Sequence, residues 1–217
     1  MINLLRSVDA LSSVVIFIAG FFALAFAISF HEFAHAFVAH KSGDMTPKAY
    51  GRLSLNPFCH FDTWGTIMML VFGFGWAKPV PIDPFNFKRP RLDFFLVSIA
   101  GILVNLLLAF LVMPLLILVY TRLPIASNFW AKFLYYFLWL FVSYNITFAV
   151  FNVLPIYPLD GFNIVLSLSK TENGYIRFMR QNGWIVLIIF ALVFSFVLTY
   201  PTDFLFNTFA SFWRLFI

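Results

Sequence analysis

Long stretches of the chain contain no charged side chain, and their lengths predict the organisation of the molecule. These stretches cover residues 10–30, 63–77, 94–121, 133–159 and 181–202, and a short apolar stretch follows at 204–213. A helix needs about 20 apolar residues to cross the hydrocarbon core of a bilayer, and the first, third, fourth and fifth stretches meet that requirement. We therefore expect an all-α polytopic membrane protein with about four spanning helices and a short C-terminal apolar helix. Residues 1–217 are expected to form a single domain.

The second stretch differs from the others because it is short and contains three glycines. At about 1.5 Å per residue, 63–77 cannot span a bilayer as a helix, and we expect a re-entrant or β-hairpin segment. The residues that follow favour extended backbone, because Pro79 and Pro81 flank Val80. An extended segment at 75–81 could hold a substrate by strand addition or form a hairpin at the membrane interface. The sequence leaves both readings open.

The composition excludes a soluble globular protein. Of 217 residues, 62% are hydrophobic and 21% are aromatic, while only 11% are charged. Soluble domains carry roughly a quarter of charged residues, whereas a bilayer accepts this much apolar surface. The net charge of +5 is spread along the chain and argues against nucleic acid as a partner. Cys59 is the sole cysteine, so the chain can form neither an internal disulfide nor a multi-cysteine metal cluster.

The basic residues predict which loops face the cytoplasm. If 63–77 does not span, loops 41–93 and 155–183 lie on one side of the membrane and carry ten of the lysines and arginines. The other four are Arg6, Arg122, Lys132 and Arg214. Because cytoplasmic loops carry the excess of basic residues, we expect both loops in the cytoplasm and a multi-pass protein of the cell (inner) membrane.

The sequence His31-Glu32-Phe33-Ala34-His35 directly follows the first apolar stretch. On a helix, residues four apart share a face, so His31 and His35 can bind one zinc ion. Glu32 then lies beside the metal, where it can take a proton from water as the catalytic base. The alternative is a helix end whose polar residues merely meet the interface. Ionisable residues at this depth are costly, which favours the functional reading.

A catalytic zinc site needs a third protein ligand, and Asp160 is a candidate. The stretch 133–159 returns the chain to the same side of the membrane as His35, at about the same depth. The other carboxylates lie on the opposite side or in more hydrophilic loops. In the alternative reading Asp160 is the N-cap of a short helix that begins near Phe162. Position alone gives the two readings equal weight.

Further motifs accompany these residues: G-D at 43–44, G-R-L-S-L-N-P at 51–57, G-W-A-K-P-V-P at 75–81, A-G-I-L-V-N at 100–105 and F-N-V-L-P-I-Y-P-L-D-G at 151–161. With H-E-F-A-H they resemble, in the same order, the motifs of site-2-protease-type intramembrane zinc metalloproteases. The similarity is to the compact bacterial and archaeal branch without a PDZ or CBS domain. It implies that His31, His35 and Asp160 bind zinc and that Glu32 is the catalytic base.

Two positions depart from the family pattern. Ile102 stands where family members usually carry proline, and Tyr157 stands where they often carry the first of two prolines. Neither position is a zinc ligand, so the departures bear on local backbone shape and not on activity.

Two asparagines are candidates for binding the substrate or the oxyanion. Asn152 lies in the fourth apolar stretch eight residues before Asp160, and an amide in hydrocarbon needs a polar partner. Asn105 follows Gly101 by four residues, so both share one helix face, and a structural role is favoured for it. For Asn152 the alternative is a hydrogen bond between helices.

We therefore predict a zinc endopeptidase with one Zn²⁺ per chain and its active site toward the cytoplasmic side. Its expected partners are the lipid bilayer and a membrane-protein or membrane-anchored peptide, which it cuts in or near transmembrane segments; the sequence is also compatible with a homo-oligomer. The alternatives are a membrane zinc or proton transporter and an inactive scaffold. A transporter would carry polar residues along several spans, which these stretches lack, and an intact set of site residues argues against a scaffold.

Overall fold

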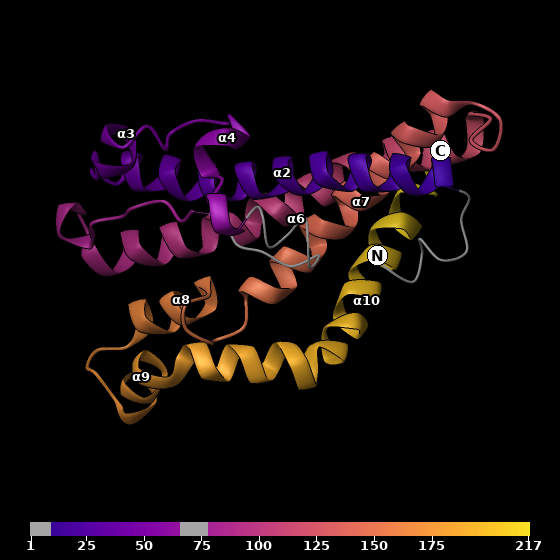
Figure 1. Ribbon diagram of the computed structural model, residues 1–217. Coiled ribbons are helices and arrows are strands. Elements are labelled where there is room, and N and C mark those ends of the chain that lie inside the picture. Colours follow the sequence, from indigo (N-terminus) through magenta and orange to yellow (C-terminus); the bar gives the residue numbers. More distant parts are fainter. Residues whose placement is uncertain (1–9, 66–77) are drawn as a thin grey trace.

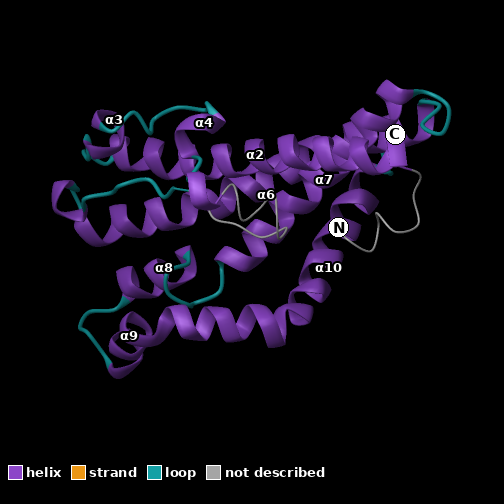
Figure 2. Cartoon of the chain, viewed as in Figure 1, coloured by secondary structure: helices purple, strands orange, loops and turns teal. Residues whose placement is uncertain are grey.

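The computed structural model describes residues 10–65 and 78–217, and this part of the chain is predominantly helical (Figures 1 and 2). Three long helices form its centre: α2 (Ala10–Lys41), α6 (Pro90–Arg122) and α7 (Phe129–Asn152). The other elements are α3 (Thr46–Ala49), α4 (Pro57–His60), η1 (Pro84–Asn86), α8 (Asp160–Leu168), α9 (Gly174–Ile189), η2 (Phe190–Phe194), η3 (Ser195–Leu198) and α10 (Thr199–Trp213). No strand is assigned within the described residues. The predicted re-entrant segment lies outside them beyond Gly65.

The long helices α2, α6 and α7 pack against one another, and α8 packs on α6 (Figure 1). The run from α9 to α10 departs from this bundle and returns to it, so that α10 packs on α6 and α7. By length and composition, four helical stretches can cross a membrane: Leu11–Lys41, Pro90–Arg122, Phe129–Asn152 and Gly174–Trp213. The prediction of an all-α protein with four long apolar helices is confirmed. The limits of each span in a bilayer remain a prediction.

The side chains of α2 explain how closely it packs on its neighbours. Ala19, Ala23 and Ala27 recur at intervals of four and are fully buried, whereas Phe22 and Phe26 are exposed. Small residues let helix backbones approach each other in a bilayer, where large apolar side chains can meet lipid. The same pattern holds in α6, whose outward face carries the exposed leucines Leu103, Leu107, Leu111, Leu115 and Leu118. This arrangement suits a molecule surrounded by hydrocarbon.

The connection between α7 and α8 differs from the prediction. The fourth apolar stretch continues to residue 159, but α7 ends at Asn152. Pro155 and Pro158 explain the early end, because proline lacks an N–H group and disfavours helical backbone in the residue before it. The next helix begins at Asp160 and not near Phe162, and its N-cap residue is Leu159. The N-cap reading of Asp160 is therefore wrong.

The fifth apolar stretch and the short apolar stretch after it are joined in one long helical run. Helix α9 begins at Gly174, ahead of the predicted residue 181, and passes through the π-helical η2 and the 3₁₀-helical η3 into α10. The hydrogen-bonding pattern changes without a break in the coil. The C-terminal apolar helix is therefore present, but it continues the preceding helix instead of following a loop.

Candidate metal centre

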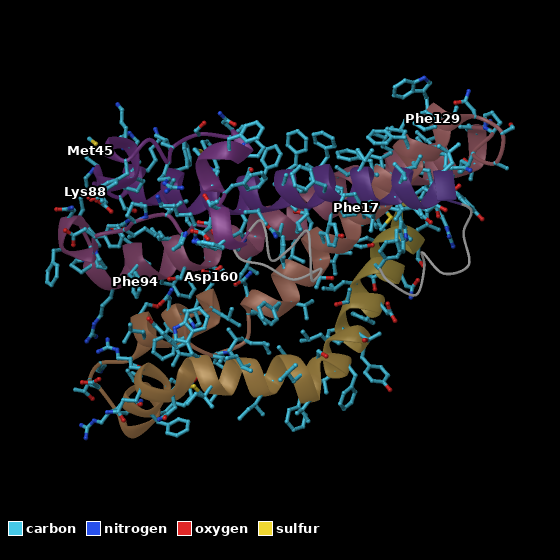
Figure 3. All side chains as sticks on the ribbon, in the orientation of Figure 1. Phe17, Met45, Lys88, Phe94, Phe129 and Asp160 are labelled. Atoms are coloured by element: carbon cyan, nitrogen blue, oxygen red, sulfur yellow. The ribbon has the colours of Figure 1, made fainter. Side chains whose placement is uncertain are left out.

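Three side chains from α2 and α8 converge on one point. His31 and His35 lie one turn apart on α2, and their Nε2 atoms are 3.1 Å from each other. The Oδ2 atom of Asp160, the first residue of α8, lies 3.3 Å from each of these nitrogens. All three residues lie largely out of solvent. Figure 3 shows Asp160 on the side of α8 that faces α6.

The triangle of ligand atoms has the size that zinc requires. Zinc bonds of about 2.0–2.1 Å at tetrahedral angles place two ligand atoms about 3.3 Å apart, which agrees with the observed separations. Three protein ligands leave the fourth position of a tetrahedron open, as in catalytic zinc sites. Within the described residues, the Oδ2 atom of Asp160 is buried and lacks a hydrogen-bond donor. A cation between the three atoms would compensate this charge.

The backbone of α6 fixes the orientation of His35. The carbonyl oxygen of Val97 lies 2.7 Å from Nδ1 of His35 and can only accept, so Nδ1 carries the proton. Consequently the lone pair of Nε2 points into the triangle, ready for a metal. Hydrogen bonds of this kind to the second ring nitrogen are typical of metal-binding histidines.

Gly101 of α6 lies directly against the histidine pair. A Cβ atom at this position would lie 2.5 Å from Cε1 of His31 and 2.5 Å from Nε2 of His35. These separations are too short for any side chain, so only glycine lets α6 approach the centre this closely. The sequence identified Gly101 only as a small residue on a helix face shared with Asn105. Its contact with the histidines could not be read from the sequence, because it depends on how α6 packs on α2.

Glu32 is held by the chain that follows the undescribed segment. Its Oε2 atom accepts a 3.1 Å hydrogen bond from the backbone N–H of Val80. The same segment is tied at two further points, since Lys78 N–H donates to the His60 carbonyl and Asp83 N–H donates to Oδ2 of Asp44. Residues 78–83 form no helix, as the prolines predict. Whether this segment accepts a substrate strand stays a prediction, and its first part, 75–77, lies outside the described residues.

The electrostatics of Asp160 favour the charged form that a metal needs. Burial raises the pKa of its carboxyl group, but without a metal the positive charge of protonated His35 and hydrogen bonds from both imidazoles outweigh burial and hold the pKa below its usual range. The carboxylate is therefore ionised at neutral pH. It offers a negative ligand to a cation, which two neutral histidines alone would not.

The two predicted asparagines and His60 have different surroundings. Asn105 is fully buried on α6, one turn beyond Gly101, and both of its amide atoms lack a hydrogen-bond partner within the described chain. Asn152 is the last residue of α7 and is half-buried. Its role toward a substrate stays a prediction. His60 is fully buried, and its Nε2 donates to the Ser54 carbonyl, so this side chain stabilises the loop.

Comparison with known proteins adds independent information on the family. A model of Peptidase family M50 matches residues 120–196, which include Asp160 but not the histidine pair. YwhC of Bacillus subtilis, whose name describes a zinc metalloprotease, is 44% identical over 171 residues, covering 79% of this chain and 77% of its own. The chain belongs to peptidase family M50. As a member of this family it is an intramembrane zinc metalloprotease of the site-2-protease type, and zinc is its metal.

More distant relatives of the M50 chain carry the same description. Rip2 of Mycobacterium tuberculosis is 31% identical, with 83% of this chain and 68% of the relative covered. Rip2 of Mycolicibacterium smegmatis is 26% identical, with 84% of this chain and 70% of the relative covered. Both are named as zinc metalloproteases. No solved structure matches the chain closely enough to count as a relative, and the comparisons give no support to a transporter.

Proposed function

We propose that His31, His35 and Asp160 hold the single zinc ion of this protease and that Glu32 is its general base. One observation carries the proposal: the three ligand atoms form a triangle with edges of 3.1–3.3 Å, and the carboxylate next in sequence to His31 lies beside it. The substrate is a membrane protein or membrane-anchored peptide, cut in or near its transmembrane segment.

Each residue has a defined task in peptide hydrolysis. Zinc, when bound, acts as a Lewis acid that polarises the scissile carbonyl and lowers the pKa of water. Glu32 takes a proton from the attacking water while the new C–O bond forms, and it returns the proton to the amine nitrogen as the C–N bond breaks. The Val80 N–H holds one oxygen of Glu32, which leaves the other free for this proton.

The centre lies a short way inside the end of α2. His35 precedes the last residue of the helix, Lys41, by six positions, which is roughly 9 Å along the axis. We place this end of the bundle on the cytoplasmic side because ten of the fourteen basic residues belong to loops at this end. The protease would then reach a peptide bond near the cytoplasmic boundary of the hydrocarbon core.

The Glu32→Gln variant tests the assignment. Glutamine keeps the size of the side chain and can still accept from Val80 N–H, but it cannot take a proton from water. We expect the cleavage rate of a membrane-embedded peptide substrate to fall by roughly 10²–10⁴, with zinc content unchanged by metal analysis. Glu172→Gln, a change on an exposed loop, is the matched control and should leave both quantities unaltered. A Glu32→Gln enzyme of normal rate would disprove the role of Glu32.

A further inference from the structure

A cavity of about 770 Å³ lies between α6, α7 and α10, near the C-terminal end of α6 and so away from the metal centre. Its floor is apolar and includes Met113 and Leu116, two core residues that are almost fully buried. Its lining also includes Arg122, in the last turn of α6, and Arg214, directly after α10. The cavity therefore combines an apolar floor with two positive charges.

The two arginines are available for a ligand. Within the described residues, neither side chain forms a hydrogen bond or an ion pair with the protein. Lys132, at the same end of the molecule, is different because its Nζ atom donates to Oγ of Ser12. A guanidinium group gains from the negative end of a helix dipole, and both arginines stand at such an end, Arg122 in the last turn of α6 and Arg214 directly after α10. The helix dipoles do not explain why these two helix ends line one cavity together with buried apolar residues.

The depth of the cavity suits a molecule with an apolar tail. From Met113 to Arg122 the axis of α6 rises by about 13–14 Å, and Arg122 lies at one end of this distance. The helices that line the cavity are held together, because Trp213 donates to the Phe110 carbonyl and so fixes the end of α10 on α6. Tyr135 adds an amphipathic ring to the lining, a residue type that gathers at membrane interfaces.

We propose that this cavity binds one anionic phospholipid of the bilayer. The headgroup phosphate contacts Arg122 and Arg214, whose planar guanidinium groups match phosphate oxygens, and one acyl chain lies over Met113 and Leu116. A free phosphate would leave the apolar floor unused, and a zwitterionic lipid would bring a positive group to two arginines. Because the bound lipid touches α6 and α10 together, it stabilises the return of the C-terminal helix to the bundle. The proposal is independent of the metal centre.

Native mass spectrometry of the full-length protein tests the proposal with defined lipids. At low ionic strength we expect dioctanoyl phosphatidylglycerol to bind roughly tenfold more tightly than dioctanoyl phosphatidylcholine, since each arginine near a membrane surface contributes to attraction. The double variant Arg122→Gln/Arg214→Gln should lose this preference. Arg177→Gln, an exposed arginine of α9 away from the cavity, is the matched control and should keep it.

Several outcomes would overturn the proposal. Equal affinity of the wild-type chain for both lipids would contradict it, as would an unchanged preference in the double variant. Competition by glycerol phosphate at the concentration of the lipid would mark a simple anion site, and a mass shift by a whole chain would assign the cavity to a second copy. If the double variant does not fold, the wild-type protein alone tests the proposal. Its preference for phosphatidylglycerol should fall as the sodium chloride concentration is raised, and a preference that does not change would contradict the role of the arginines.

Discussion

At the level of single residues, Gly101 leaves the space that the two histidines need beside α6. We expect Gly101→Ala to lower zinc affinity and cleavage rate about tenfold or more, because its Cβ would collide with both histidines. Zinc content after dialysis against a weak chelator measures the first effect. Gly174→Ala is the matched control, since a Cβ there meets no atom within 4 Å. A Gly101→Ala chain with normal zinc content would mean that α6 can move away from α2 without consequence.

The charge of Asp160 leads to a second prediction at this scale. Asparagine has the same shape, but its amide is a weak and neutral ligand, so Asp160→Asn should lose most of its zinc while the helices remain folded. Metal analysis and far-ultraviolet circular dichroism measure the two quantities. Asp203→Asn, in the exposed part of α10, provides the control. Full zinc retention in Asp160→Asn would require another carboxylate as the third ligand.

These residues show what a sequence can indicate about a site. The spacing of His31 and His35 follows from helix geometry alone, so their convergence could be predicted. Asp160 could be placed at the right depth but not distinguished from a helix cap, because side-chain direction depends on the turn at Pro155 and Pro158. The Val97 carbonyl and the Val80 N–H carry no signal in the sequence. Every residue has such groups, and only the packing selects them.

At the level of elements, Asp44 joins the turn after α2 to the turn around η1. Its carboxylate is fully buried and accepts from Thr46 N–H, Asp83 N–H and the Asn86 amide. Asp83 lies three residues from Val80, so this junction also positions the segment that contacts Glu32. The sequence placed Asp44 in a hydrophilic loop. Its burial depends on contacts between segments about forty residues apart, which a local pattern does not show.

The Asp44 junction predicts a pH-dependent stability. Burial raises the pKa of this carboxyl, but the hydrogen bonds from Thr46, Asp83 and Asn86 lower it below its ordinary value of 3.8. Stability from a lowered pKa is present above the ordinary value and is lost as the pH falls through the folded-state value. Asp44→Asn should therefore destabilise the protein by about 1–3 kcal/mol at neutral pH, because one donor then faces an amide NH₂.

Thermal unfolding of Asp44→Asn and wild type across pH measures this effect. The difference between the two melting temperatures should be largest at neutral pH and should shrink below about pH 4. Asp83→Asn serves as the control, because asparagine can still accept from Phe85 N–H at that exposed turn. A difference that does not change with pH would show that Asp44 acts through its shape and not through its charge.

For the whole molecule, the sequence predicted the helices well because the signal is physical and simple. Charge-free stretches of spanning length became α2, α6, α7 and the run from α9 to α10. The hydrophobic pattern did not predict two kinds of detail, the helix ends and the continuity of the last helical run. Helices end before the apolar stretch does where proline or a loop follows, as after Asn152. The long run from Gly174 to Trp213 could not be recognised as continuous, because Asp203 interrupts the apolar pattern without interrupting the helix.

The orientation of the whole chain leads to the last prediction. The proposed metal centre needs α2, α6 and α7 to bring loops 41–93 and 155–183 to the same end of the bundle, and the excess of basic residues predicts that this end lies in the cytoplasm. In a Cys59→Ser background, single cysteines at Phe85, which is 97% exposed, and at the exposed Lys170 should resist an impermeant thiol reagent added to intact cells. A cysteine at the exposed Ser127, in the connection from α6 to α7, should react. All three should react once the cells are permeabilised, which shows that each thiol is accessible in the folded protein. Labelling at 85 and 170 but not at 127 in intact cells would contradict the cytoplasmic placement of these loops. A cysteine at Tyr50, which is 70% exposed and precedes residues 63–77, then separates the two causes. It reacts in intact cells if the whole chain is reversed. It resists if residues 63–77 cross the membrane, which would put His35 and Asp160 on opposite sides and contradict the centre.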